Sequence, residues 1–185
     1  LGNVINPQEI LNTEGAEALR LWSAIEGDIA TQDLMCSRER IKAELKTLNK
    51  LLNITKFVTQ FKKPKKAKLT KTDTLFIEYL DTISLNADQS YAKYDFNRPV
   101  VKLRQFLWDT FASHYLELVK NRAYNEEKAF TKAESESAHF TLHILLERLI
   151  LLLHPIVPQI TSVIAQELKL SLETLPLFKA KKTDS

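Results

Sequence analysis

The sequence predicts an all-α protein, folded as an antiparallel helix bundle. Apolar residues recur every three or four positions over long segments, which is the period of a helix. No segment of useful length alternates with the period of two that a strand requires. All three glycines lie within the first 27 residues, so tight hairpins and glycine-lined phosphate loops, which need positive φ or close backbone approach, are not expected after them.

The first elements are expected to be two short helices. Asn6 is a suitable N-cap, and Pro7 suits the first helical position that follows it. A second short helix is expected over residues 16–24, and a connection over residues 26–33. These short helices are expected to precede the bundle rather than to form part of it.

Five further helical segments are expected. Ser37 can cap the first, Thr70 or Thr72 the second, and Pro99 suits the start of the third. The pair His154-Pro155 separates the last two, because proline disfavours the α conformation in the residue before it. The expected ranges are about 38–61, 71–91, 99–120, 135–153 and 157–170, with a loop over 121–130.

The expected inner faces follow from apolar spacing. In segment 38–61 the inner stripe is Ile41, Leu45, Leu48, Leu52 and Phe61, and the opposite face carries Lys42, Lys46, Lys50, Asn53, Lys56 or Phe57, and Gln60. In the segment that begins at Pro99 the stripe is Val100, Leu103, Leu107, Phe111, His114 or Tyr115, and Leu118.

Positive charge is concentrated between residues 38 and 71. This stretch holds twelve Lys or Arg and two acids, a net charge of +10, whereas the rest of the chain holds 14 basic and 21 acidic residues. Such a localised charge is expected of a polyanion-binding surface, and the alternative is a solvated charged face. The lysine-rich part, residues 61–68, is either a solvated linker or a site of non-specific phosphate contact.

Other classes of site are not supported. Cys36 is the only cysteine, which excludes an intrachain disulfide and a four-cysteine zinc site and fits a reducing, cytoplasmic setting. The most apolar stretch, residues 144–157, is interrupted by charge and is too short to span a bilayer. His139, His143 and Glu147 share a helical face, but Phe140 stands where a metalloprotease needs glutamate, so no metal site is expected.

No catalytic residue is expected in this chain. It has no Walker loop, no G-x-G-x-x-G and no G-x-S-x-G. It also begins at leucine without a signal-peptide pattern, which suggests a piece of a longer protein.

Several segments resemble class I aminoacyl-tRNA synthetases. Residues 1–7 are similar to the segment that follows the KMSKS loop in the enzymes for valine, isoleucine and leucine, and residues 14–22 are similar to the block Y-G-A-D-A-L-R. Residues 49–58 resemble N-K-L-x-N-x-x-R-F-V, although Lys56 replaces an arginine and so loses its planar fork. Residues 94–97 and 106–124 resemble the valine branch in particular, and residues 152–161 resemble the block that closes the bundle.

The resemblance implies a parent ligase that activates valine with ATP and Mg²⁺ and transfers it to the tRNA for valine. Leu1, Gly2 and Asn3 would lie beside an ATP site whose machinery is upstream, and the fragment itself would need no cofactor. Residues 1–32 would be the stem-contact part, 33–172 the helical anticodon-binding domain, and 173–185 a tail. The parent would be a cytoplasmic monomer that does not bind membranes.

The same resemblance suggests which side chains contact tRNA. Anticodon loops present unstacked bases, which aromatic rings stack on and polar groups read. Phe57 would stack, Asn53 would hydrogen-bond a base or ribose, and Lys50 and Lys56 would bind base edges or phosphates. Lys46, Arg40 and Arg38 would extend the basic track.

Three alternatives stay open at this stage. The chain could be the same domain of an isoleucyl- or leucyl-tRNA synthetase, a stand-alone basic helical RNA-binding module, or a helical protein–protein scaffold. The sequence upstream of Leu1 would separate a ligase fragment from a stand-alone module. A salt titration of tRNA binding would separate either from a scaffold.

Overall fold

The computed structural model describes residues 6–27 and 36–172, and within these ranges every regular element is helical. The prediction of an all-α fold is therefore confirmed. In chain order the elements are α1 (Pro7–Thr13), α2 (Ala16–Glu26), α3 (Arg38–Val58), α4 (Lys71–Tyr91), α5 (Asn97–Gln105), the π-helix η1 (Phe106–Tyr115), α6 (Leu116–Tyr124), α7 (Lys132–Leu153) and α8 (Pro158–Glu167).

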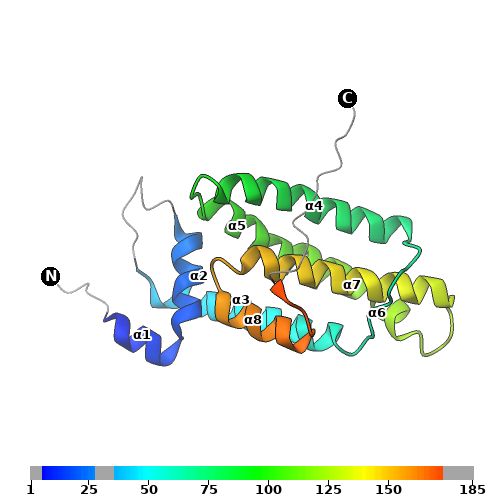
Figure 1. Cartoon of the computed structure of the whole chain (residues 1–185). Coiled ribbons are helices and arrows are strands. Elements are labelled where there is room, and N and C mark those ends of the chain that lie inside the picture. Colours follow the sequence, from blue (N-terminus) through cyan, green and yellow to red (C-terminus); the bar gives the residue numbers. More distant parts are fainter. Residues whose placement is uncertain (1–5, 28–35, 173–185) are drawn as a thin grey trace.

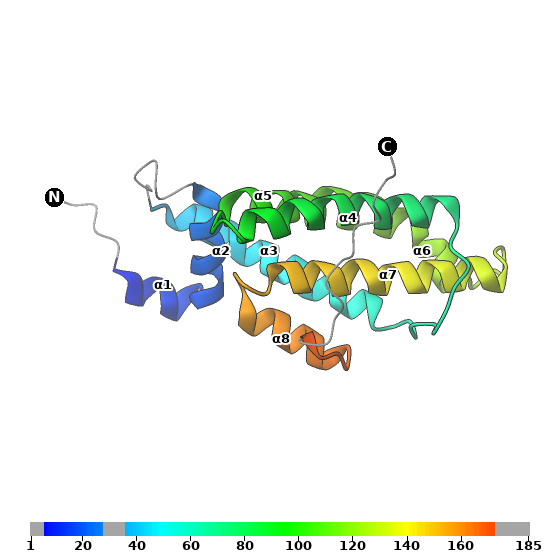
Figure 2. The ribbon, with the colours of Figure 1, turned by 45° about the horizontal axis from the view of Figure 1, so that its top comes forward.

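The long helices lie side by side around α7. Helices α5, η1 and α6 follow one another without a break and form a single rod, which packs with α4 on one side of α7 (Figure 1). Helices α3 and α8 lie on the other side of α7, and α1 and α2 lie across one end of the bundle (Figure 2).

Capping side chains mark the helix starts. Asn6 accepts a hydrogen bond from the backbone N–H of Gln8, and Ser37 caps α3, as the sequence predicted. Of the two threonines that could cap α4, Thr70 does so. Thr131 and Glu134 form a complete capping box, so α7 begins three residues before the expected Ser135.

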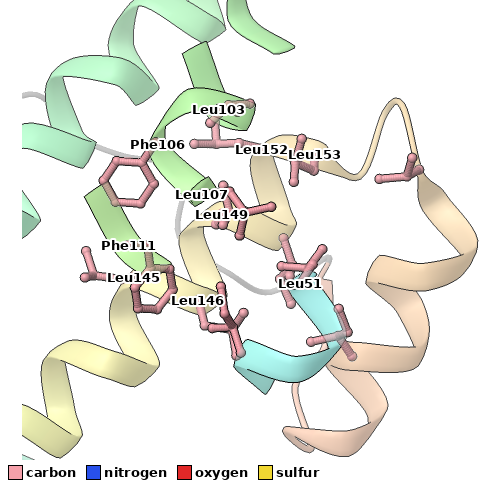
Figure 3. Close-up of a cluster of buried hydrophobic side chains, with 14 of the residues drawn as sticks. Leu51, Leu103, Phe106, Leu107, Phe111, Leu145, Leu146, Leu149, Leu152 and Leu153 are labelled. Atoms are coloured by element: carbon pink, nitrogen blue, oxygen red, sulfur yellow. The ribbon is translucent and has the colours of Figure 1, made fainter. Parts of the chain in front are cut away.

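The core lies where α7 meets α3 and the α5–η1–α6 rod. Leu145, Leu146 and Leu149 of α7 are fully buried and face Leu51 of α3 and Phe111 of η1 (Figure 3). Because α7 touches both layers, it buries side chains around most of its circumference.

Three residues of the stripe predicted for segment 38–61, Ile41, Leu48 and Phe61, are buried, but the inner face of α3 departs from that stripe at other positions. Leu51, Ile54 and Val58 are buried, whereas Leu45 and Leu52 are only half-buried. Polar side chains such as Glu44 and Thr47 are buried on the same face. The predicted stripe was built from apolar residues alone and therefore did not include these buried polar positions.

The buried face of the segment that begins at Pro99 also differs from the predicted stripe, because this segment contains a π-helix. The predicted continuation through Leu118 is wrong, because Leu118 is 59% exposed while Tyr115 and Val119 are buried. A π-helix has i→i+5 hydrogen bonds and wider turns, so the buried face advances in steps of four. Helix α6 also continues to Tyr124, which shortens the expected loop.

Helix α2 is joined to the bundle by polar contacts. The Arg20 guanidinium donates to the carbonyl of Ile156 at 2.6 Å, and the Asn97 amide donates to the carbonyl of Ala24 at 3.0 Å. The Glu17 carboxylate accepts from the backbone N–H of Ile160 at the start of α8, where negative charge is favoured.

Leu1, Gly2 and Asn3 lie outside the described residues. Within residues 6–27 and 36–172, no helix combines the length and the apolarity needed to cross a bilayer.

Candidate nucleic-acid interface

A shallow groove of about 170 Å³ runs between α3 and the η1–α6 rod. Lys50, Asn53 and Phe57 line it from α3, so the structure gathers three of the side chains that were selected from the sequence. The opposite wall and the floor consist of Ile54, Ala112, Leu116, Glu117 and Lys120.

The aromatic ring of Phe57 is held in place by other rings. It is half-buried, and its centroid lies 5.3 Å from that of Phe61 and 5.9 Å from that of Tyr124, both in edge-to-face geometry. The Tyr124 hydroxyl donates to the side chain of Gln60 at 2.9 Å. Such contacts fix the ring orientation in advance, which lowers the entropic cost of binding a ligand there.

The ammonium group of Lys50 is also positioned. It lies 4.9 Å from the centroid of the Trp108 ring, within the range of a cation–π interaction. The Trp108 indole N–H donates to the Thr47 hydroxyl at 3.0 Å, which orients the indole. Lys50 therefore presents a positive charge at the groove without an acidic partner among the described residues.

Lys46 and Lys56 extend the groove along α3. Both side chains are exposed, and neither forms an ion pair with any described residue. Lys46 lies one turn before Lys50 on the same face of α3, whereas Lys56 is turned by about 120° from Lys50 around the helix.

Arg38 and Arg40 lie apart from this groove. Arg38 is about 28 Å from Phe57 along the helix axis, at 1.5 Å per residue. Its guanidinium donates to Glu14 at 3.1 Å, and Arg40 forms an ion pair with Glu26. Both arginines thus join α3 to α1 and α2, and the structure does not bring them together with Phe57.

Comparison with known proteins decides the family. A family model described as "Anticodon-binding domain of tRNA ligase" matches residues 73–184, which is more than half of the chain. The chain belongs to the anticodon-binding domain family of tRNA ligases.

Curated relatives of this anticodon-binding domain include valine–tRNA ligases. The chain is 37% identical to that of Aeropyrum pernix over 91% of its own length, and 35% identical to that of Pyrobaculum aerophilum over 90%. It spans about one fifth (21%) of the length of each of these relatives.

A solved structure shares the fold. The free form of methionyl-tRNA synthetase from Mycobacterium tuberculosis superimposes with a TM-score of 0.75 at 16% identity, over 91% of this chain and 36% of the other. At that identity the likeness concerns the fold alone.

Sequence reasoning missed the far wall of the domain's groove. Trp108, Lys120 and Tyr124 were not selected, although each contacts or lines it. The exposed lysine and tyrosine near the end of a helical segment gave only a weak signal. Their position depends on the π-helix that precedes them, which apolar spacing did not reveal.

The three residues of the rejected metal pattern have other partners in the domain. His139 and His143 each bind a backbone carbonyl, that of Ala123 and that of Phe61 respectively, both at 2.8 Å. Glu147 binds the Lys63 ammonium at 2.6 Å. Burial lowers the pKa of His143, so the neutral ring is favoured.

A buried ion pair joins the start of α4 to α6. Asp73 of α4 is fully buried and accepts from Arg122 of α6 at 2.6 and 2.8 Å, and from Tyr115 at 2.7 Å. Burial opposes ionisation of Asp73, but these donors and Ser137 outweigh it and hold its pKa below the usual value.

A larger cavity, about 730 Å³, lies between α2, the α4–α5 turn and the α7–α8 turn. Its polar lining is largely engaged within the domain, since Arg20 and Asn97 donate to backbone carbonyls. The smaller groove is the better candidate for a nucleic-acid interface, because it gathers Lys50, Asn53 and Phe57, which were selected from the sequence.

Proposed function

We propose that this chain is the anticodon-reading part of a valine–tRNA ligase. The names of its curated relatives support valine as the amino acid. The ligation of valine to its tRNA, with ATP and Mg²⁺, would take place in a catalytic part outside this chain. We propose that the parent acts in the cytoplasm as a monomer.

The domain division belongs to the same proposal. Residues 1–32 would form the stem-contact part, 33–172 the anticodon-binding domain and 173–185 a tail. Leu1, Gly2 and Asn3 would lie beside the ATP site of the parent.

The groove would read an unstacked base of the anticodon. Phe57 would offer its ring for stacking, and Asn53 its amide for a hydrogen bond to a base edge or ribose. Lys50 and Lys56 would neutralise phosphates or bind base edges, and Lys46 would continue the contact along α3. Arg40 and Arg38 would reach the tRNA only beyond the groove, near the stem.

One observation carries this proposal. A fixed aromatic ring, an amide and an ammonium with no acidic partner among the described residues line the same groove, on the helix that opens the basic stretch. This combination matches the way proteins bind splayed-out nucleotides, by stacking, edge hydrogen bonds and charge.

Binding assays with matched transcripts test the proposal. The 185-residue chain should bind a tRNA for valine more tightly than the same transcript with another anticodon. Phe57→Ala should weaken binding by about 1–3 kcal/mol, the usual worth of a base stacked on an aromatic ring. Phe96→Ala is the matched control, because Phe96 is also partly exposed but lines the other cavity.

Two results would contradict the proposal. One is equal affinity for both anticodons, which would indicate a general RNA-binding surface. The other is unchanged affinity of Phe57→Ala with an intact helical circular dichroism spectrum, which would remove the ring from the interface.

A further inference from the structure

We propose that the basic loop, defined as residues 59–70 between α3 and α4, is a preformed binding site for the phosphate backbone of RNA. This inference rests on the proposed function, since it assumes that RNA is the ligand. It adds a second contact surface that carries affinity rather than sequence recognition.

The first half of the basic loop is anchored on α7. The Phe61 ring stacks on His139 with centroids 4.7 Å apart, and the Phe61 carbonyl accepts from His143 at 2.8 Å. Two residues later, the Lys63 ammonium donates to both carboxylate oxygens of Glu147, at 2.6 and 2.8 Å. This part of the loop therefore has a defined position against the helix.

The second half is anchored further back along the same helix. The backbone N–H of Thr70 donates to the Ser137 hydroxyl at 2.9 Å. Ser137 and Glu147 are ten residues apart on α7, or about 15 Å at 1.5 Å per residue. The basic loop thus passes from the α3 side of α7 to the α4 side, near the end where α7 begins (Figure 2).

The remaining lysines of the basic loop direct their charge to solvent. Lys62, Lys65, Lys66 and Lys68 are at least partly exposed, and none forms an ion pair with any described residue. Lys63 differs from these four lysines, because it pairs with Glu147 and anchors the loop on α7. Four like charges held on a fixed loop repel one another, and a polyanion would relieve that repulsion.

The positive charge of the basic loop continues at the first residue of α4, a position where positive charge is unfavourable. Lys71 is the first residue of that helix, where the helix dipole disfavours a positive charge. Breaking a local preference without a visible structural gain is expected at functional sites. Lys71 is exposed and has no acidic partner among the described residues.

The dimensions fit a short stretch of backbone. The anchors at Glu147 and Ser137 lie about 15 Å apart along α7, so the loop is long enough to face more than one phosphate of a strand. The basic loop also begins at the edge of the groove, because the Phe61 ring contacts both Phe57 and Tyr124. A strand whose base enters the groove could therefore continue along the loop.

Lysine is suited to such a contact. Its ammonium is a point charge on a flexible stem, which neutralises phosphate without reading sequence. We therefore expect binding at the groove to depend on the anticodon sequence, and binding at the basic loop to depend on the salt concentration.

A salt titration of a triple variant tests the basic loop. Lys65, Lys66 and Lys68 are changed to Gln in the 185-residue chain, and tRNA affinity is measured between about 50 and 200 mM salt. The slope of log K against log salt should become shallower by about 2, at about 0.7–0.9 per lost phosphate contact. The loss of affinity should be the same fold for the cognate tRNA and for an anticodon-substituted tRNA.

The control removes the same charge elsewhere. Lys93, Lys102 and Lys169 are exposed and lie outside the basic loop, and their change to Gln should leave the slope close to wild type. An equal flattening in the control would overturn the inference, because it would show a general charge effect. An unchanged slope in the loop variant would also overturn it.

Phe57→Ala separates this inference from the proposed function. Both proposals are supported if Phe57→Ala loses anticodon discrimination but keeps the salt slope, and if the triple loop variant loses salt slope but keeps anticodon discrimination. If Phe57→Ala has no effect while the loop variant flattens the slope, anticodon reading in the groove fails and the loop site stands. If the loop variant keeps its tRNA slope but loses binding to phosphatidylserine vesicles, the ligand is a membrane surface and the inference fails.

Discussion

The two ends of α3 carry similar positive charge, but the cations at one end form ion pairs within the domain and those at the other end do not. At the N-terminal end, Arg38 and Arg40 face Glu14 and Glu26, which come from the preceding helices. At the C-terminal end, Lys56 has no acidic partner among the described residues, and the surrounding side chains form a groove. A basic run in the sequence therefore does not mark a binding site along its whole length.

The same contrast divides the cations of the whole domain. Four cations are paired with a buried carboxylate: Arg38 with Glu14, Arg104 with Glu44, Lys63 with Glu147 and Arg122 with Asp73. We term a cation unpaired when it has no acidic partner among the described residues, and the unpaired cations include Lys46, Lys50, Lys56, Lys62, Lys65, Lys66 and Lys68. A buried carboxylate is costly without a partner, so loss of a paired cation should affect folding, and loss of an unpaired cation should affect binding.

The largest effect is expected at Arg122. Arg122→Met would leave the fully buried Asp73 carboxylate without its main partner, which should cost about 3–5 kcal/mol in the free energy of unfolding. Urea denaturation followed by circular dichroism measures it. A loss below about 1 kcal/mol would show that Tyr115 and Ser137 alone satisfy the carboxylate.

Neighbouring lysines give the sharpest comparison. Lys63→Met should destabilise the domain by about 1–3 kcal/mol, because it leaves the Glu147 carboxylate unsatisfied. Lys62→Met, which removes the same charge one residue earlier, should stay within about 0.5 kcal/mol of wild type. Equal effects in thermal or urea unfolding would break the distinction between paired and unpaired cations.

A pH effect of intermediate size is expected at His143. Burial lowers the pKa of His143, against the opposing effects of the Phe61 carbonyl and Glu147. As the pH falls below about 6.5, the imidazole of His143 is therefore protonated in the unfolded chain before it is protonated in the folded domain. Stability should therefore fall as the pH drops from about 6.5 to the lowered pKa, with a slope that approaches about 1.4 kcal/mol for each pH unit. His143→Gln should lose less stability than wild type between about pH 7 and 5, and an identical loss in urea denaturation at the two pH values would contradict this.

The smallest stability effect is expected at Lys46. Lys46→Met should change the free energy of unfolding by no more than about 0.5 kcal/mol, but reduce the salt slope of tRNA binding by about 1. Arg40→Met should reduce that slope by less than Lys46→Met does, because Arg40 already pairs with Glu26. The reverse result would place the tRNA at the other end of α3.

Local signals in the sequence predicted the helices well. The caps at Asn6, Ser37 and Thr70 and the break at His154-Pro155 depend on nearby residues alone, and the structure has all of them. The capping box at Thr131 is an equally local signal, but the expected start at Ser135 overlooked it.

Tertiary features were harder to predict from the sequence. The buried face of α3 includes Glu44 and Thr47, which are satisfied by Arg104 and Trp108 from distant segments. Selection of Lys50, Asn53 and Phe57 relied on a motif within one helix, so the groove's near wall could be predicted. Its far wall, including Lys120, depends on how two helices meet.

The π-helix acts as a phase shift in the rod that forms this far wall. Each residue of an α-helix advances the direction of the side chains by roughly 100°, so one residue more or fewer upstream rotates everything that follows. A one-residue deletion between Phe106 and Tyr115 would turn Lys120 away from the groove and Arg122 away from Asp73, with every contacting side chain still present. The number of residues in this segment is thus as much a determinant of the interface as their identity.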